Sequence, residues 1–144
     1  MGFRERDVVS ILDFTREDLE HLFRVSEEMI PIAEGRVKSR ILEGKNLGVL
    51  FYEPSTRTRL SFESAMLRLG GGVTGFADPR VTRASGIGKE PKEELDDMVR
   101  VVEKYVDVMV IRSLAEGSAR TAADYAKLSL IHISEPRDRT RSRM

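Results

Sequence analysis

The hydrophobic positions between residues 15 and 33 recur at spacings of three, four and seven. Charged side chains take most of the positions between them, so this segment is predicted to form an amphipathic helix. Thr15, followed by Asp18 three residues later, favours a helix start here, and Pro31 is expected to end or kink the last turn. The predicted apolar stripe comprises Leu19, Leu22, Phe23, Met29, Ile30 and Ala33.

A short apolar run follows at residues 46–52, and it does not alternate with polar residues. That pattern is typical of a strand covered on both faces, as in a parallel sheet. Helical and strand-like segments then alternate along the chain, which predicts an α/β fold: a doubly wound parallel sheet with helices on both faces and right-handed crossovers. The predicted helices span about 55–69, 93–105 and 116–127, and the predicted strands span 73–77 and 106–111.

The end of the chain departs from this alternation. Residues 128–136 are followed by arginines that alternate with small polar residues, and this pattern has no apolar period. We therefore expect residues 128–144 to be disordered. Residues 128–136 also resemble the translation of a sequencing adapter, so we predict a truncated reading frame whose native part ends near residue 127. A genuine basic tail is the alternative.

The composition is that of a globular protein, with 40% hydrophobic and 33% charged residues. Lys plus Arg equals Asp plus Glu at 24 each, so no global field points to nucleic acid or a membrane surface as a partner. The chain has no cysteine and no apolar run of bilayer-spanning length. These features predict a cytoplasmic protein with one ordered domain, residues 1–127.

The candidate chemistry lies in residues 53–59, Glu-Pro-Ser-Thr-Arg-Thr-Arg, which follow the first predicted strand and open a helix. Ligands of α/β sheets bind at such junctions, and helix N-termini present unpaired N–H groups to anions. Ser55, Thr56 and Thr58 add hydroxyl groups, and Arg57 adds a guanidinium that can grip two phosphate oxygens. The stretch predicts a phosphate site without a Walker sequence. An ordinary capped helix with its arginines in solvent is the alternative.

The run Glu-Pro-Ser-Thr-Arg-Thr-Arg-Leu-Ser-Phe-Glu at residues 53–63 resembles the carbamoyl-phosphate signature of the aspartate and ornithine carbamoyltransferase family. Residues 65–71 and 75–78 continue the resemblance in the style of the aspartate enzymes. Residues 105–112 resemble the third strand of the family, which ends in an active-site arginine. The resemblance covers about residues 7–127 and implies the carbamoyl-phosphate-binding domain, the first of two domains in these enzymes.

The resemblance also implies roles for individual residues. Ser55, Thr56, Arg57 and Thr58 are expected to hold the phosphate of carbamoyl phosphate. Arg112 is expected to bind the same substrate and, with Thr58, to reach its carbonyl oxygen, where negative charge develops during attack. Arg57, Thr58 and Arg112 are therefore the implied catalytic residues.

In this family a serine and a lysine from the neighbouring subunit complete the phosphate site. Ser85 and Lys89 keep the expected spacing of four, but the sequence after Lys89 departs from the family pattern, so Lys92 is a second candidate. The resemblance thus implies a homotrimer, to which a regulatory chain can be added.

The implied reaction is carbamoyl transfer from carbamoyl phosphate to the amine of L-aspartate, an early step of pyrimidine biosynthesis. It requires no metal or organic cofactor, and the sequence offers no metal constellation. The family's aspartate enzymes usually have His-Pro after the arginine, whereas this chain has Ser113-Leu114. Ornithine or another amine therefore stays an alternative acceptor, and a phosphate-binding module without catalysis is an alternative of another class. The residues that bind the amino acid belong to the second domain, so this chain alone is expected to be inactive.

Overall fold

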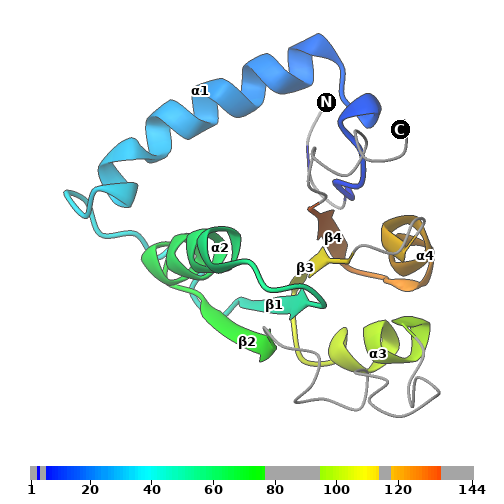
Figure 1. Cartoon of the computed structure of the whole chain (residues 1–144). Coiled ribbons are helices and arrows are strands. Elements are labelled where there is room, and N and C mark those ends of the chain that lie inside the picture. Colours follow the sequence, from blue (N-terminus) through cyan, green and yellow to red (C-terminus); the bar gives the residue numbers. More distant parts are fainter. Residues whose placement is uncertain (1–2, 4–5, 77–94, 114–117, 134–144) are drawn as a thin grey trace.

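A four-stranded parallel sheet forms the centre of the computed structural model, which describes residues 3, 6–76, 95–113 and 118–133 (Figure 1). The strands are β1 (Asn46–Phe51), β2 (Gly72–Phe76), β3 (Val108–Arg112) and β4 (Ser129–His132), and their order across the sheet is β2-β1-β3-β4. Because β1 lies inside the sheet, the chain leaves it first to one side and then to the other. This is the doubly wound arrangement that the sequence predicts.

Helices cover both faces of the sheet, as predicted. On one face, Met66 and Phe62 of α2 (Thr56–Arg68) pack against a cluster that includes Phe51. On the other face, Val99 of α3 (Leu95–Val102) and Ala122 of α4 (Ser118–Tyr125) pack against a second cluster. Both clusters contain side chains from β1 and β3, which explains why these two strands are apolar without alternation.

Contacts with the neighbouring strands fix the alignment of β1. Asp107, just before β3, accepts hydrogen bonds from the Lys45 ammonium and from the Asn46 backbone N–H, each at 2.8 Å. Gly75 of β2 has a φ of +136° and pairs with Val49, whose backbone oxygen a β-carbon at Gly75 would overlap. Residues with larger side chains are therefore excluded from this position of β2.

The first helix, α1 (Arg16–Ala33), begins as the sequence predicts. Thr15 accepts a hydrogen bond from the Asp18 N–H at 3.2 Å, and the Asp18 carboxylate accepts one from the Thr15 N–H at 3.0 Å. Pro31 lies within the helix, which ends at Ala33. A 3₁₀ turn, η1 (Ile11–Asp13), precedes α1. Within the described ranges, no helix is both long enough and apolar enough to cross a membrane.

The expected disorder of residues 128–144 is wrong for residues 129–132, which form β4. This strand pairs in parallel with β3, and the Leu130 side chain is fully buried. The amino-terminal segment holds its other edge, because the Val8 N–H donates to the Leu130 carbonyl and the Asp7 carboxylate accepts from the Leu130 N–H, both at 2.8 Å. The buried Leu130 side chain, the pairing with β3 on one edge and the hydrogen bonds to Asp7 and Val8 on the other are sufficient to order β4. Residues 134–144 lie outside the described part of the chain.

Candidate anion-binding site

The start of α2 is built as an open helix terminus. Ser55 is its N-cap residue, with φ −150° and ψ 94°, but its hydroxyl makes no capping hydrogen bond. The first helical bond runs from the Arg59 N–H to the Ser55 carbonyl at 3.1 Å. The N–H groups of the first turn therefore have no helical acceptor and point out of the helix end. Such a terminus carries partial positive charge and favours an anion.

The predicted phosphate ligands sit on this terminus with their polar groups unused. Thr56 and Arg57 are exposed and Thr58 is half-buried. Across the described residues, no hydrogen bond or ion pair engages the side chains of Ser55, Thr56, Arg57 or Thr58. By contrast, Arg59 on the next turn lies 3.7 Å from the Glu63 carboxylate, an i,i+4 pair. The four predicted side chains are thus free to donate to a ligand.

Arg112 reaches the same edge of the sheet from β3. It pairs in register with Phe51, the last residue of β1, and its carbonyl accepts from the Tyr52 N–H at 2.9 Å. The linker from Phe51 to Ser55 is only three residues long, so the end of β3 and the start of α2 share one edge. Figure 1 shows α2 beginning directly after the tip of β1. The structure therefore brings Ser55, Thr56, Arg57, Thr58 and Arg112 to one end of the sheet.

Arg112 is a buried charge, with 7% of its surface exposed. Its guanidinium lies 3.8 Å from the carboxylate of Glu53, which is half-buried. A buried guanidinium needs anionic partners, since desolvating it without one is costly. Glu53 has this role in the described structure, and the sequence reasoning assigned it none. The sequence shows only that both residues lie at the ends of strands, and the pairing of β1 with β3 that brings them together comes from the structure.

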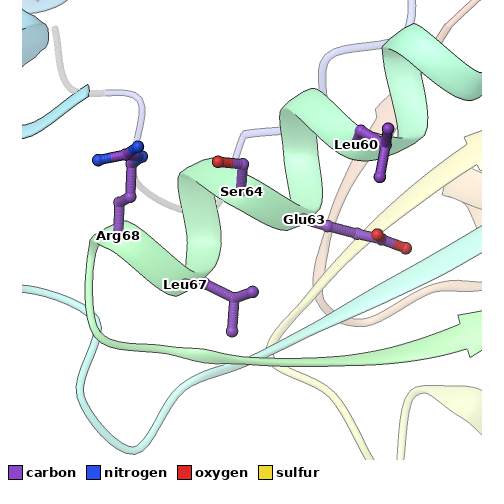
Figure 2. Close-up of a pocket in the computed structure, with 5 residues that line it drawn as sticks. All are labelled: Leu60, Glu63, Ser64, Leu67 and Arg68. Carbon is purple, nitrogen blue, oxygen red and sulfur yellow. The ribbon is translucent and has the colours of Figure 1, made fainter. Parts of the chain in front are cut away.

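A shallow hollow lies apart from this edge. Figure 2 shows a shallow hollow on the outer face of α2, and none of the predicted site residues lines it. The predicted loop residues Ser85, Lys89 and Lys92 lie outside the described residues. In the described part of the chain, no group of three or more His, Cys, Asp or Glu side chains is placed to hold a metal ion. The hollow is lined by Leu60, Glu63, Ser64, Leu67 and Arg68.

The donors at this edge suit a doubly charged oxyanion: a helix terminus, three hydroxyl groups, one exposed guanidinium and one buried guanidinium. A parallel α/β sheet with such donors at this edge is typical of phosphate-binding domains of the doubly wound class. A family model described as the aspartate/ornithine carbamoyltransferase, carbamoyl-P binding domain matches residues 6–137. The chain belongs to this family, and the match runs past the boundary expected at residue 127.

Relatives with known names agree with the family model. The chain is 44% identical over 132 residues to the aspartate carbamoyltransferase catalytic subunit of Methanosarcina barkeri, covering 92% of this chain and 41% of that one. It is 47% identical over 129 residues to the subunit of the same name from Methanothermobacter thermautotrophicus, covering 90% and 40%. The chain thus spans about two fifths of the length of these relatives.

Solved structures show the same partial coverage. The catalytic subunit of M. jannaschii aspartate transcarbamoylase superposes with a TM-score of 0.79 at 37% identity, covering 90% of this chain and 42% of that one. The Trypanosoma cruzi aspartate transcarbamoylase in complex with carbamoyl phosphate and aspartate gives a TM-score of 0.78 at 30% identity, covering 90% and 41%. The fold is therefore that of part of these enzymes.

Proposed function

We propose that this chain is the carbamoyl-phosphate-binding part of an enzyme that transfers the carbamoyl group to the amine of L-aspartate in pyrimidine biosynthesis. The observation that carries the proposal is the unused donor set of Ser55 to Thr58 beside the buried guanidinium of Arg112. Relatives named for aspartate support this acceptor over ornithine, although Ser113-Leu114 replaces the usual His-Pro.

The chemistry asks the protein for positioning and charge stabilisation. The aspartate amine attacks the carbonyl carbon, the new C–N bond forms, and the C–O bond to phosphate breaks with its electron pair leaving on phosphate. The attacking amine loses a proton, which passes to the departing phosphate. Ser55, Thr56 and Arg57 hold the phosphate, while Thr58 and Arg112 donate to the carbonyl oxygen, on which charge peaks in the transition state.

Glu53 is an anionic partner of Arg112 within the protein, and a bound substrate contacts the same guanidinium. The Glu53 carboxylate lies 3.8 Å from the guanidinium. A bound phosphate or carbonyl oxygen adds a further acceptor to the same buried cation, so Glu53 and the ligand share the guanidinium. Because the carboxylate holds the guanidinium at this edge before the ligand arrives, less ordering is needed at the moment of binding.

The remaining parts of the enzyme are proposals from the family. The amino-acid-binding residues belong to the part of the relatives that this chain does not span, so the chain alone is expected to have no transferase activity. A homotrimer is proposed in which Ser85 and Lys89, or Lys92, complete a neighbour's phosphate site. A regulatory chain and a cytoplasmic location are proposed on the same basis.

Phosphate binding by the purified chain tests the site directly. Arg57→Ala should weaken the affinity for inorganic phosphate by roughly 10- to 100-fold, because a hydrogen bond to a charged group contributes about 1.5–3 kcal/mol. Isothermal titration at constant ionic strength measures this change. Arg16→Ala is the control, since Arg16 is an exposed arginine on α1 paired only with Glu20. Equal phosphate affinities of the parent chain, Arg57→Ala and Arg16→Ala would contradict the proposed phosphate site.

Arg112→Ala separates the catalytic proposal from a phosphate-binding module without catalysis. In the chain extended to full length with the missing part of the Methanosarcina barkeri relative, kcat should fall by more than the affinity for carbamoyl phosphate. The reason is that the partner charge of Arg112 is largest in the transition state. A loss confined to binding contradicts the catalytic role, and no production of carbamoyl aspartate by the unsubstituted full-length protein contradicts the transferase proposal.

A further inference from the structure

Tyr52 directly follows β1, and its side chain lies on the face of the sheet opposite α2. Phe51, the last residue of β1, packs in the cluster that contains Met66 of α2, whereas Tyr52 packs against the cluster that contains Val99 of α3. Figure 1 shows α2 and α3 on opposite sides of the sheet. The Tyr52 hydroxyl oxygen is buried, so the ring extends into the protein interior. The proposed mechanism gives this residue no role.

Contacts of Tyr52 join the ends of three strands. Its backbone N–H donates to the Arg112 carbonyl at 2.9 Å, which extends the pairing of β1 with β3 by one residue beyond Phe51. Its ring meets the ring of Phe76, the last residue of β2, edge-on at a centroid distance of 5.3 Å. Phe76 pairs in register with Leu50, two residues before Tyr52 and on the same face of the sheet. Because edge-to-face aromatic pairs have a defined geometry, the ring fixes the direction in which the chain leaves β1.

The residues that follow Tyr52 belong to the proposed site. Glu53 is its neighbour in the chain, and the Glu53 carboxylate lies 3.8 Å from the buried Arg112 guanidinium. Ser55, the N-cap residue of α2, comes three residues after Tyr52. Pro54 lies between Glu53 and Ser55, and its ring fixes φ, which limits the freedom of this short linker. A shift of Tyr52 is therefore passed on both to the guanidinium and to the N–H groups of the first helical turn.

We propose that Tyr52 is a positioning residue of the anion-binding site. Its ring, held against Phe76 on the far face of the sheet, fixes the start of α2 and the end of β3 relative to each other. Tyr52 does not itself contact the ligand, and it acts through Glu53, Arg112 and the backbone of Ser55. The inference rests on the proposed function, because it concerns the same site. Donors to an oxyanion must be held within about 0.5 Å of their working positions, so an anchor behind them affects affinity as well as stability.

Phosphate affinity and stability, measured on the same preparations, separate positioning from packing. Tyr52→Ala should weaken the affinity for inorganic phosphate by roughly tenfold or more, the loss expected when one hydrogen bond to a charged group is misaligned. Tyr52→Phe keeps the ring, so its phosphate affinity should stay within about twofold of that of the parent chain. If Tyr52→Ala does not fold, Tyr52→Leu takes its place, because leucine keeps apolar volume but has no ring to meet Phe76.

Val106→Ala is the matched control. Val106 belongs to the core cluster against which Tyr52 packs and is 8% exposed, but it lies just before β3, at the opposite end of the sheet from the site. Its truncation should lower stability and leave phosphate affinity unchanged at a temperature where every variant is folded.

NMR signals of the first turn of α2 give a reading that packing alone does not change. In Tyr52→Ala, the Thr56 and Arg57 amide signals should differ from those of the parent chain before phosphate is added, and they should shift less when it is added. In Val106→Ala both signals should keep the parent positions and the parent response to phosphate.

Unchanged phosphate affinity in Tyr52→Ala would overturn the inference, and so would an equal loss of affinity in Val106→Ala. An equal loss in Tyr52→Phe would also overturn it, in favour of a contact through the hydroxyl. Arg57→Ala distinguishes these failures from failure of the proposed function. If Arg57→Ala still weakens phosphate binding, the phosphate site stands and only the role of Tyr52 falls, whereas a parent chain that binds no phosphate contradicts both.

Discussion

The N-cap residues of α1 and α2, Thr15 and Ser55, are expected to respond in opposite ways to the loss of a hydroxyl. Thr15 caps α1, because its hydroxyl accepts from the Asp18 N–H at 3.2 Å within a complete capping box. Ser55 occupies the same position at the start of α2, but its hydroxyl makes no capping bond. Thr15→Ala should therefore remove stability, whereas Ser55→Ala should remove affinity for an anion.

The magnitudes follow from the contacts. Replacing a capping Thr by Ala costs about 1 kcal/mol of unfolding free energy, within a usual range of roughly 0.5–2 kcal/mol. Ser55 has no such bond to lose, so its substitution should change stability by less than about 0.5 kcal/mol. A hydroxyl that donates to a phosphate contributes at least about 1.5 kcal/mol, so Ser55→Ala should weaken phosphate binding by roughly tenfold or more.

Urea denaturation followed by circular dichroism measures the first quantity, and isothermal titration with inorganic phosphate measures the second. Both are performed on the same preparations at one ionic strength, since exposed charges are screened by salt. The reasoning is refuted if Ser55→Ala lowers stability as much as Thr15→Ala does. It is refuted equally if Ser55→Ala binds phosphate as tightly as the parent chain.

Two further predictions concern the sheet. Gly75→Ala should lower the unfolding free energy by about 2–4 kcal/mol, because its φ is +136° and a β-carbon meets the Val49 backbone. Gly44→Ala should cost only about 1 kcal/mol, since its φ of +78° disfavours Ala but nothing lies near the added carbon. Hydrogen bonds from the Lys45 ammonium and then the Asn46 N–H lower the pKa of Asp107. Its stabilising effect is thus complete above about pH 4 and is lost as pH falls further, so Asp107→Asn should flatten the acid limb of a stability profile.

The sequence predicted most of the fold because the local signals agree with one another. The capping pattern at Thr15 and the apolar run of β1 each depend on residues close together in the chain. The failure at β4 has a different cause. Order in that strand comes from β3 and from Asp7, which are distant in sequence, so no local pattern around Leu130 could reveal it.

Some residues of the candidate site could be predicted from a local run of sequence, and others could not. Ser55, Thr56, Arg57 and Thr58 are consecutive, and a run of hydroxyl and guanidinium groups after a strand is visible without any structure. The placement of Arg112 beside them followed from the family resemblance, and the parallel pairing of β1 with β3 explains it. The ion pair with Glu53 was missed, because it depends on which strands are neighbours and on the burial of the guanidinium.

The hydrogen bond between Asp7 and Leu130 joins positions that are 123 residues apart. The amino-terminal segment is therefore synthesised long before its partner strand β4 exists. Closure of such a distant pairing is slow relative to local helix formation. Until it occurs, the backbone groups along the outer edge of β4 are open to strands of other nascent chains, so the pairing of β4 with the amino-terminal segment protects the sheet against aggregation.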